Sequence, residues 1–169
     1  MGVIITIIII IIMEGINMNL KQILFEGLSR DLEKKARRVM EKTVSQAESD
    51  GYRVTFTGTY RQATAISGSS EIAVPFVVAQ TSDQISKREQ GILEGRVYDM
   101  GKYAGLQGEL KADSVEFTKR YQNGVMNRNP IEYSGKSTDG GNTYEGTWEF
   151  ESSTADMAKK GTFIMEKKS

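Results

Sequence analysis

The sequence predicts a mainly β fold, an eight-stranded antiparallel up-and-down barrel preceded by one long amphipathic helix. Short segments of alternating apolar and polar residues follow one another through residues 52–168. Turn-forming residues separate several of them, as at Asn123-Gly124 and Asp139-Gly140-Gly141. Evenly spaced strands with tight turns are typical of antiparallel meanders, which often close into barrels. A barrel of about eight strands has an interior that holds only side chains or one small ligand.

The composition excludes several classes of function. The 169 residues suffice for one core, and 22 basic side chains balance 22 acidic ones, so no nucleic-acid partner is expected. Cysteine and histidine are both absent. Their absence excludes disulfides, sulfur-ligated metals and the usual general base at neutral pH. We therefore expect no metal and no cofactor, and a non-catalytic role. An enzyme that uses lysine or carboxylates in the mouth of the barrel is the alternative with the least support.

The first 17 residues contain an isoleucine tract at residues 3–13, broken by Thr6. A membrane-spanning helix needs about 20 apolar residues, and no basic residue or A-x-A pattern suggests a signal peptide. We interpret residues 1–17 as a low-complexity segment outside the fold, and the protein as cytoplasmic. Membrane association or export through residues 3–13 is the alternative, and pairing of the tract as a strand is a third reading.

A long amphipathic helix is predicted over residues 19–49. Asn19 suits its N-terminal cap, and Asp50-Gly51 ends it. One apolar stripe recurs at steps of three and four residues: Leu20, Leu24, Leu28, Leu32, Ala36, Val39, Thr43 and Ala47. A basic cluster on this helix has acidic neighbours close by, so we interpret it as a solvated face. A homo-oligomer formed through the helix is a further expectation.

The predicted domains are the N-terminal segment 1–17, the helical segment 18–50 and the barrel 51–169. Alternation places Val54, Phe56 and Tyr60 on one face of the first strand, and Trp148 on the apolar face of the seventh. Residues 66–70 and 81–90 are predicted as longer loops. The expected strands are 52–61, 71–79, 91–98, 102–110, 114–122, 130–136, 143–151 and 161–167.

The barrel segment resembles a group of small, mostly uncharacterised calycin-like domains, which share the architecture of lipocalins, fatty-acid-binding proteins and avidins. The resemblance covers residues 52–168 and implies the barrel fold. Gly58-Thr59-Tyr60 has tyrosine where lipocalins have the Gly-x-Trp opening, so retinoid, fatty-acid or biotin binding is not implied. The motifs that carry it are Phe56-Thr57-Gly58-Thr59-Tyr60, Asp99-Met100-Gly101-Lys102-Tyr103, Phe117-Thr118-Lys119-Arg120-Tyr121, Ile131-Glu132-Tyr133-Ser134-Gly135, Gly146-Thr147-Trp148-Glu149-Phe150 and Gly161-Thr162-Phe163-Ile164-Met165.

Lys119 is the strongest candidate for a functional side chain. Alternation places it on an apolar face, where a lysine seldom lacks a partner. It either holds an anionic ligand group, pairs with an inward Glu94 or Glu109, or extends to the rim of the barrel. We predict a binding or interaction module that accommodates a small apolar or anionic amphiphile. Its expected lining is Phe56, Tyr60, Phe117, Lys119, Tyr121, Tyr133 and Trp148.

Overall fold

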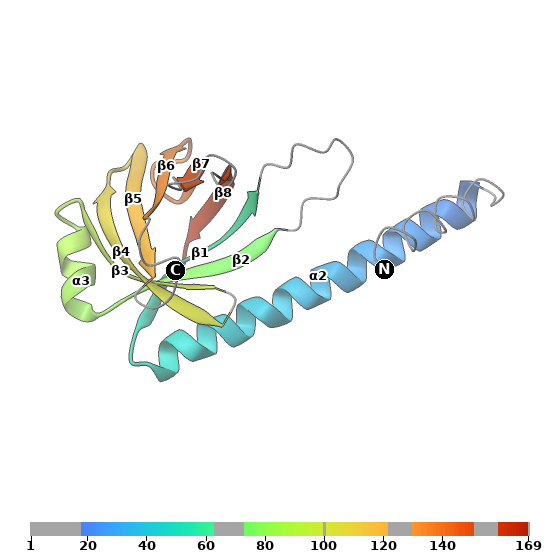
Figure 1. Cartoon of the computed structure of the whole chain (residues 1–169), viewed down its shortest axis with the longest axis horizontal. Helices are drawn as coiled ribbons and strands as arrows, with labels where there is room; N and C mark the ends of the chain where they lie inside the picture. The colour runs from blue at the N-terminus through green and yellow to red at the C-terminus, as the bar shows by residue number, and fades with distance from the viewer. Residues whose placement is uncertain (1–17, 63–72, 100, 122–129, 151–158, 169) are drawn as a thin grey trace. The chain divides into compact units, whose positions relative to one another are not determined.

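The computed structural model describes residues 18–62, 73–99, 101–121, 130–150 and 159–168. Eight of its strands form one closed barrel, in which each strand is hydrogen-bonded to the strands before and after it and β8 pairs with β1. All the pairs are antiparallel. Figure 1 shows the strands following one another around the barrel in chain order. The predicted fold class is confirmed.

The strand bounds lie within three residues of those predicted. The strands are β1 (Arg53–Gln62), β2 (Val74–Gln80), β3 (Ile92–Asp99), β4 (Lys102–Leu110), β5 (Ser114–Tyr121), β6 (Ile131–Ser137), β7 (Thr143–Phe150) and β8 (Lys159–Lys167). The predicted turn at residues 139–142 joins β6 to β7, with positive φ angles at Gly140 and Gly141. The Asp139 carboxylate accepts backbone hydrogen bonds from Asn142 and Thr143 there.

Large side chains fill the inside of the barrel. Phe117 stacks on Tyr133 with ring centroids 4.5 Å apart, and Phe163 meets the Tyr133 ring edge-on at 5.3 Å. These side chains belong to one cluster whose buried members are at most 6 % exposed. Its buried members are Phe56, Phe76, Val78, Leu93, Val97, Leu106, Val115, Phe117, Tyr133, Tyr144, Trp148, Phe163 and Met165.

A β-bulge in β1 corrects the predicted faces of that strand. The register against β2 shifts between Val54 and Phe56, so these two residues lie on opposite faces. Phe56 joins the interior cluster, whereas Val54 joins a second cluster with Val77 and Ala79 of β2. Alternation alone misplaced Val54 because a bulge inserts an extra residue and resets the period of two.

The helix α2 (Met18–Ser49) confirms the predicted helix. The chain divides into two units, residues 1–38 and 39–169. In the first, the side chains of residues 31 and 33–38 are exposed. In the second, the end of α2 packs against the second cluster through Ala47, which is fully buried. No helix within the described ranges has the length and hydropathy of a membrane span.

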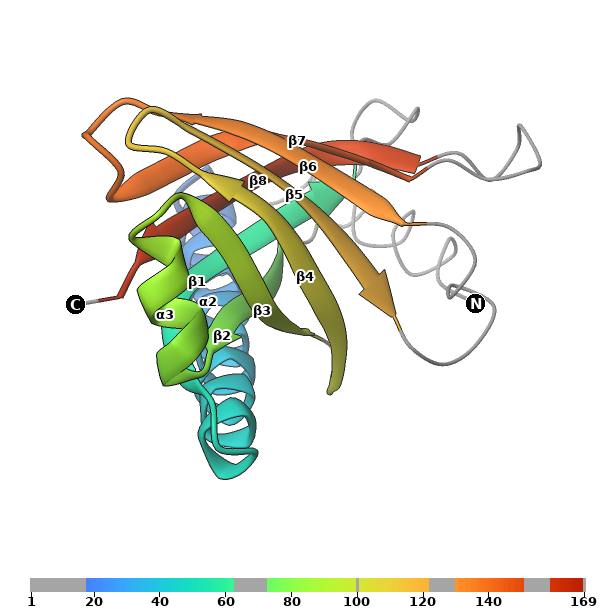
Figure 2. The same cartoon turned by 90° about the vertical axis from the view of Figure 1, so that its left-hand side faces the viewer.

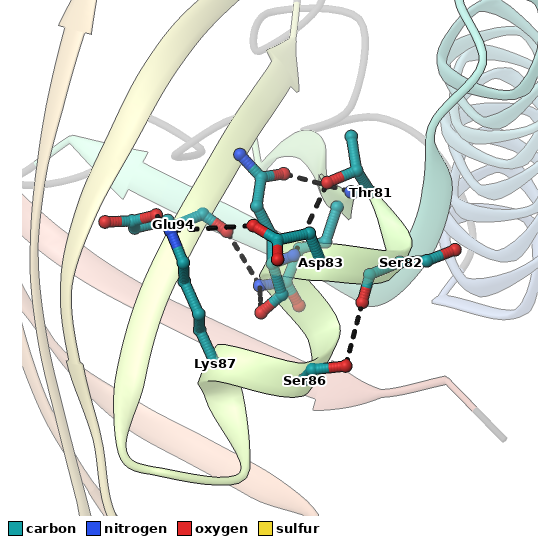
Figure 3. A network of polar contacts seen from close by, with 8 residues as sticks. Thr81, Ser82, Asp83, Ser86, Lys87 and Glu94 are labelled. Carbon is teal, nitrogen blue, oxygen red and sulfur yellow. Dashed lines mark hydrogen bonds and ion pairs between the residues drawn. The ribbon is translucent and has the colours of Figure 1, made fainter.

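Residues 81–90, predicted as a loop, contain the short helix α3 (Ser82–Arg88). Thr81 caps its start: the Thr81 hydroxyl accepts from the Gln84 backbone, and the Gln84 side chain accepts from the Thr81 backbone. This capping box was the sequence signal for the helix. The Lys87 ammonium then binds the Glu94 carboxylate on β3 at 3.1 Å (Figure 3). Figure 2 shows α3 beside β3, at the end of the barrel where β2 gives way to β3.

A buried lysine–aspartate cluster as the candidate site

The opposite end of the barrel carries a polar cluster. Asp99 is the last residue of β3 and Tyr121 the last of β5, while Lys119 lies two residues before Tyr121. Tyr60 contributes from β1, two residues before that strand ends. The cluster thus lies where three strands terminate, close to one mouth of the barrel. The connections 63–72 and 122–129 that follow β1 and β5 are outside the described residues, and so is the predicted loop 66–70.

The local sequence aims these side chains inward. Lys119 is in phase with Phe117 and Tyr121 along β5, and all three are buried. Asp99 is in phase with Leu93 and Val97 along β3, and all three are buried as well. Since successive side chains of a strand point to opposite faces, the alternation that buries the apolar residues also buries both charges.

The Asp99 carboxylate accepts hydrogen bonds from three side chains. The Lys119 ammonium binds its Oδ2 atom as an ion pair. The Tyr121 hydroxyl donates to Oδ1 at 2.9 Å, and the Tyr60 hydroxyl donates to Oδ2 at 3.3 Å. Asp99 is 0 % exposed and Lys119 is 1 % exposed. Within the described residues, no buried side-chain polar atom lacks a hydrogen-bond partner.

Aromatic rings surround the ammonium as well. The Lys119 Nζ atom lies 4.7 Å from the centroid of the Tyr121 ring and 5.4 Å from that of Tyr60. A cation at this distance from an aromatic face is attracted by the ring's electron density. Lys119 therefore interacts with one full negative charge and with two electron-rich rings.

Burial dominates the electrostatics of this cluster. Loss of solvent lowers the pKa of Lys119, and the neighbouring Asp99 carboxylate offsets part of that effect. Burial, the charge of Asp99 and the hydrogen bond to it all raise the pKa of Tyr60 and of Tyr121. Burial also raises the pKa of Tyr133, with smaller contributions from Tyr60 and Asp99. The phenols therefore stay protonated and act as donors.

The partner of Lys119 is neither of the carboxylates expected from the sequence. Glu94 binds Lys87 of α3, and Glu109 binds the exposed Lys111. The partner is Asp99, the last residue of β3, which begins the turn-forming sequence Asp99-Met100-Gly101, in which Gly101 adopts a positive φ. Its spacing of two from Val97 was the signal that placed its side chain inside.

The predicted lining residues separate into groups. Tyr60, Lys119 and Tyr121 meet around Asp99, and Trp148 contacts this group because its ring lies 5.9 Å from that of Tyr60. The Trp148 Nε1 atom donates to the Arg61 carbonyl at 2.9 Å.

The other predicted lining residues make separate contacts. Phe117 and Tyr133 form the stacked pair described above. Phe56 lies beneath the Arg88 guanidinium of α3, at 5.5 Å, and so belongs to the α3 end of the interior. The structure therefore brings together four of the predicted residues at one end of the barrel.

The outer wall of the barrel carries two grooves. One, of about 510 Å³, lies over β4–β7 and is lined mainly by exposed residues such as Glu109, Glu116, Glu132 and Glu149. The second, of about 570 Å³, lies over β3–β5. Within the described ranges, no group of three or more acidic side chains is arranged to hold a metal ion.

Neither the models of known protein families nor the curated proteins compared with this chain match it. The isoleucine tract, with the alternative of membrane association through residues 3–13, lies outside the described residues.

Proposed function

We propose that the protein is a calycin-like, non-catalytic binding module that holds a small amphiphilic ligand at the Lys119–Asp99 end of its barrel. The up-and-down order of eight strands supports a calycin-like architecture. The interior supports a ligand with an apolar body, because aromatic and aliphatic side chains line it. The polar cluster supports a ligand with a hydrogen-bonding head group.

The observation that carries this proposal is the burial of two charges in an otherwise apolar interior. Among the described residues, Lys119 and Asp99 are the charged side chains that are buried. Removing two ions from water costs several kcal/mol for each, and well-packed apolar residues often give equal or greater stability. Titratable groups in such environments cluster at functional sites. A binding role explains why Lys119 and Asp99 are buried despite this cost.

The position of the cluster gives a ligand a route to it. Tyr60 is partly exposed and lies near the end of β1, whereas Lys119 and Asp99 are almost fully buried. The interior is already packed, so a ligand enters by displacing side chains, and Tyr60 is a partly exposed one beside the cluster. Rotation of Tyr60 costs its 3.3 Å hydrogen bond to Asp99 and leaves the 2.9 Å bond from Tyr121 in place.

Binding of a neutral fluorescent amphiphile, a fluorescent fatty alcohol, tests the proposal. The test variant replaces both charges, Lys119→Met with Asp99→Leu, so that no unpaired charge is left in the interior. The matched control is Lys136→Met, which removes an exposed lysine from β6. We expect the double variant to bind at least tenfold more weakly and the control to bind as wild type.

Displacement by a fatty acid of similar length then shows whether the site also accepts a charged head group. Absence of saturable binding to wild type would contradict a ligand-binding role. Undiminished binding to the folded double variant would contradict the assignment of the ligand to this end of the barrel.

A further inference from the structure

We propose that Lys119 forms an imine with a small apolar aldehyde and that Asp99 is the counterion of the resulting iminium. This inference rests on the proposed ligand site and specifies the head group that the site accepts. The observation behind it is the pairing of one buried amine with one buried carboxylate beside the aromatic rings of Tyr60 and Tyr121.

The charge balance of the cluster favours a carbonyl head group over an acid. Lys119 and Asp99 together are neutral, and each is at most 1 % exposed. A carboxylate ligand would add a second negative charge beside Asp99, and like charges in a poorly solvated site repel strongly. A neutral aldehyde adds no charge, so the cluster stays balanced during binding.

The covalent step also preserves the pair. The Lys119 nitrogen attacks the carbonyl carbon after one of its protons passes to Asp99, so a C–N bond forms and the carbonyl oxygen is protonated. The carbon–oxygen bond then breaks, and the oxygen leaves as water. In total, the ammonium, the carboxylate and the aldehyde become an iminium, the same carboxylate and one water. No oxidant or reductant is needed. Asp99 is paired with one positive charge both before the reaction, in the ammonium, and after it, in the iminium.

The surroundings of Lys119 make its amine reactive. Burial lowers its pKa, which raises the fraction of neutral amine, the form that attacks carbonyls. The carboxylate that takes the proton is already in contact with Nζ. The hydroxyls of Tyr60 and Tyr121 donate to the same carboxylate and keep their protons, so either hydroxyl can turn from Asp99 to donate to the carbonyl oxygen once Asp99 has taken the lysine proton.

The neighbouring positions are small or apolar. Lys119 is paired across the sheet with Leu106 on β4 and Ile131 on β6, and beyond Leu106 lies Gly95. Tyr121 is paired with Ala104, which is fully buried. An aldehyde with a slender apolar body meets no charged side chain among these neighbours.

Reductive trapping on the full-length protein tests the inference. Wild type is incubated with cinnamaldehyde and cyanoborohydride, and the modified lysines are identified by peptide mass spectrometry. We expect Lys119 to be modified at least tenfold faster than the exposed Lys102, Lys136 and Lys160 of the same molecule. Modification confined to the exposed lysines would overturn the inference without any need for a variant.

Two variants separate chemistry from folding. Lys119→Arg keeps a cation for Asp99 and cannot form an imine, so we expect the label at this position to disappear. Asp99→Asn keeps the lysine and removes its proton acceptor and counterion, so we expect trapping to slow at least tenfold. Equal trapping in a folded Asp99→Asn protein would remove Asp99 from the mechanism.

Cinnamyl alcohol, which cannot form an imine, separates this inference from the proposed function. If the alcohol displaces the fluorescent amphiphile from wild type and Lys119 is not trapped, the imine is wrong and the binding site stands. If neither the alcohol nor the aldehyde binds, both proposals fail.

Discussion

Replacing Lys119 alone is expected to destabilise the barrel far more than replacing Lys119 and Asp99 together. Lys119→Met exchanges a buried ammonium for an apolar chain of similar length and leaves the Asp99 carboxylate at 0 % exposure with no cation. Breaking a buried ion pair in this way costs about 3–5 kcal/mol. Asp99 keeps the hydroxyls of Tyr121 and Tyr60 as donors, so we expect about 3 kcal/mol, the lower end of that range.

The double variant Lys119→Met/Asp99→Leu removes both charges and keeps approximate side-chain volumes. Apolar replacement of a whole buried pair is often neutral or stabilising by about 1–4 kcal/mol. We therefore expect the double variant to be at least as stable as wild type, so the two changes compensate each other instead of adding.

Urea unfolding measures these differences. The chain has one tryptophan, Trp148, which is 6 % exposed in the folded barrel, so its fluorescence reports unfolding. Circular dichroism gives a second signal, and Lys136→Met serves as the exposed-lysine control. A loss below about 1 kcal/mol for Lys119→Met would show that the Lys119–Asp99 pair contributes little to the stability of the folded barrel. A double variant as unstable as the single one would show that packing, and not charge pairing, decides the effect.

Three other predictions follow from the buried phenols, one glycine and the outer wall. The pKa values of Tyr60, Tyr121 and Tyr133 are raised on folding. Their contribution to the stability of the fold is therefore intact below pH about 10, the pKa of tyrosine in the unfolded chain, and is lost as the pH rises above it. Each such phenol removes about 1.4 kcal/mol of stability per pH unit there, so the ring NMR signals of these three tyrosines should show ionisation only together with the loss of circular dichroism; their ionisation in a folded barrel would contradict this. Gly161→Ala should cost about 3 kcal/mol or prevent folding, because its Cβ would overlap the Arg61 carbonyl oxygen, whereas Gly105→Ala, with its nearest atom at 3.7 Å, should melt within a few degrees of wild type; equal melting points would refute the close approach. Glu132→Lys should raise the free energy of unfolding in urea by about 0.2–1 kcal/mol, because Glu132 lies directly opposite Glu149. A lowered free energy of unfolding would show that the two carboxylates do not repel each other.

Much of the barrel is predictable from the sequence because a sheet wetted on one side imposes a period of two. That period locates Phe117, Lys119 and Tyr121 on one face without knowledge of any partner strand, and the structure buries all three. The period of two does not indicate which strands face each other across the interior. The pairing of Lys119 on β5 with Asp99 on β3 depends on the closure of the barrel, so the expected partners Glu94 and Glu109 were wrong.

Local features that break the period account for the other differences. The bulge next to Val54 resets the alternation, and only the register against β2 reveals it. The helix α3 is shorter than the window in which helical periodicity can be recognised, so its local signals were the capping residues Thr81 and Gln84 and the charges of its end turns, Asp83 in the first and Lys87 and Arg88 in the last. Both features lie away from the cluster, so alternation still placed Lys119 and Tyr121 on the inner face of β5.

The hydrogen bond from Trp148 to the Arg61 carbonyl has a consequence for how the chain folds. Most pairs of neighbouring strands are adjacent in sequence and can form by local hairpin closure, but β8 must return to β1 across almost the whole domain. Contacts of large sequence separation are formed slowly because loop closure costs entropy before any contact compensates it. The Trp148–Arg61 bond spans 87 residues and lies beside this closing seam. Its indole is therefore placed to report the last step of folding, and a slow fluorescence phase that follows the formation of β-sheet circular dichroism would be the kinetic signature of the barrel closing.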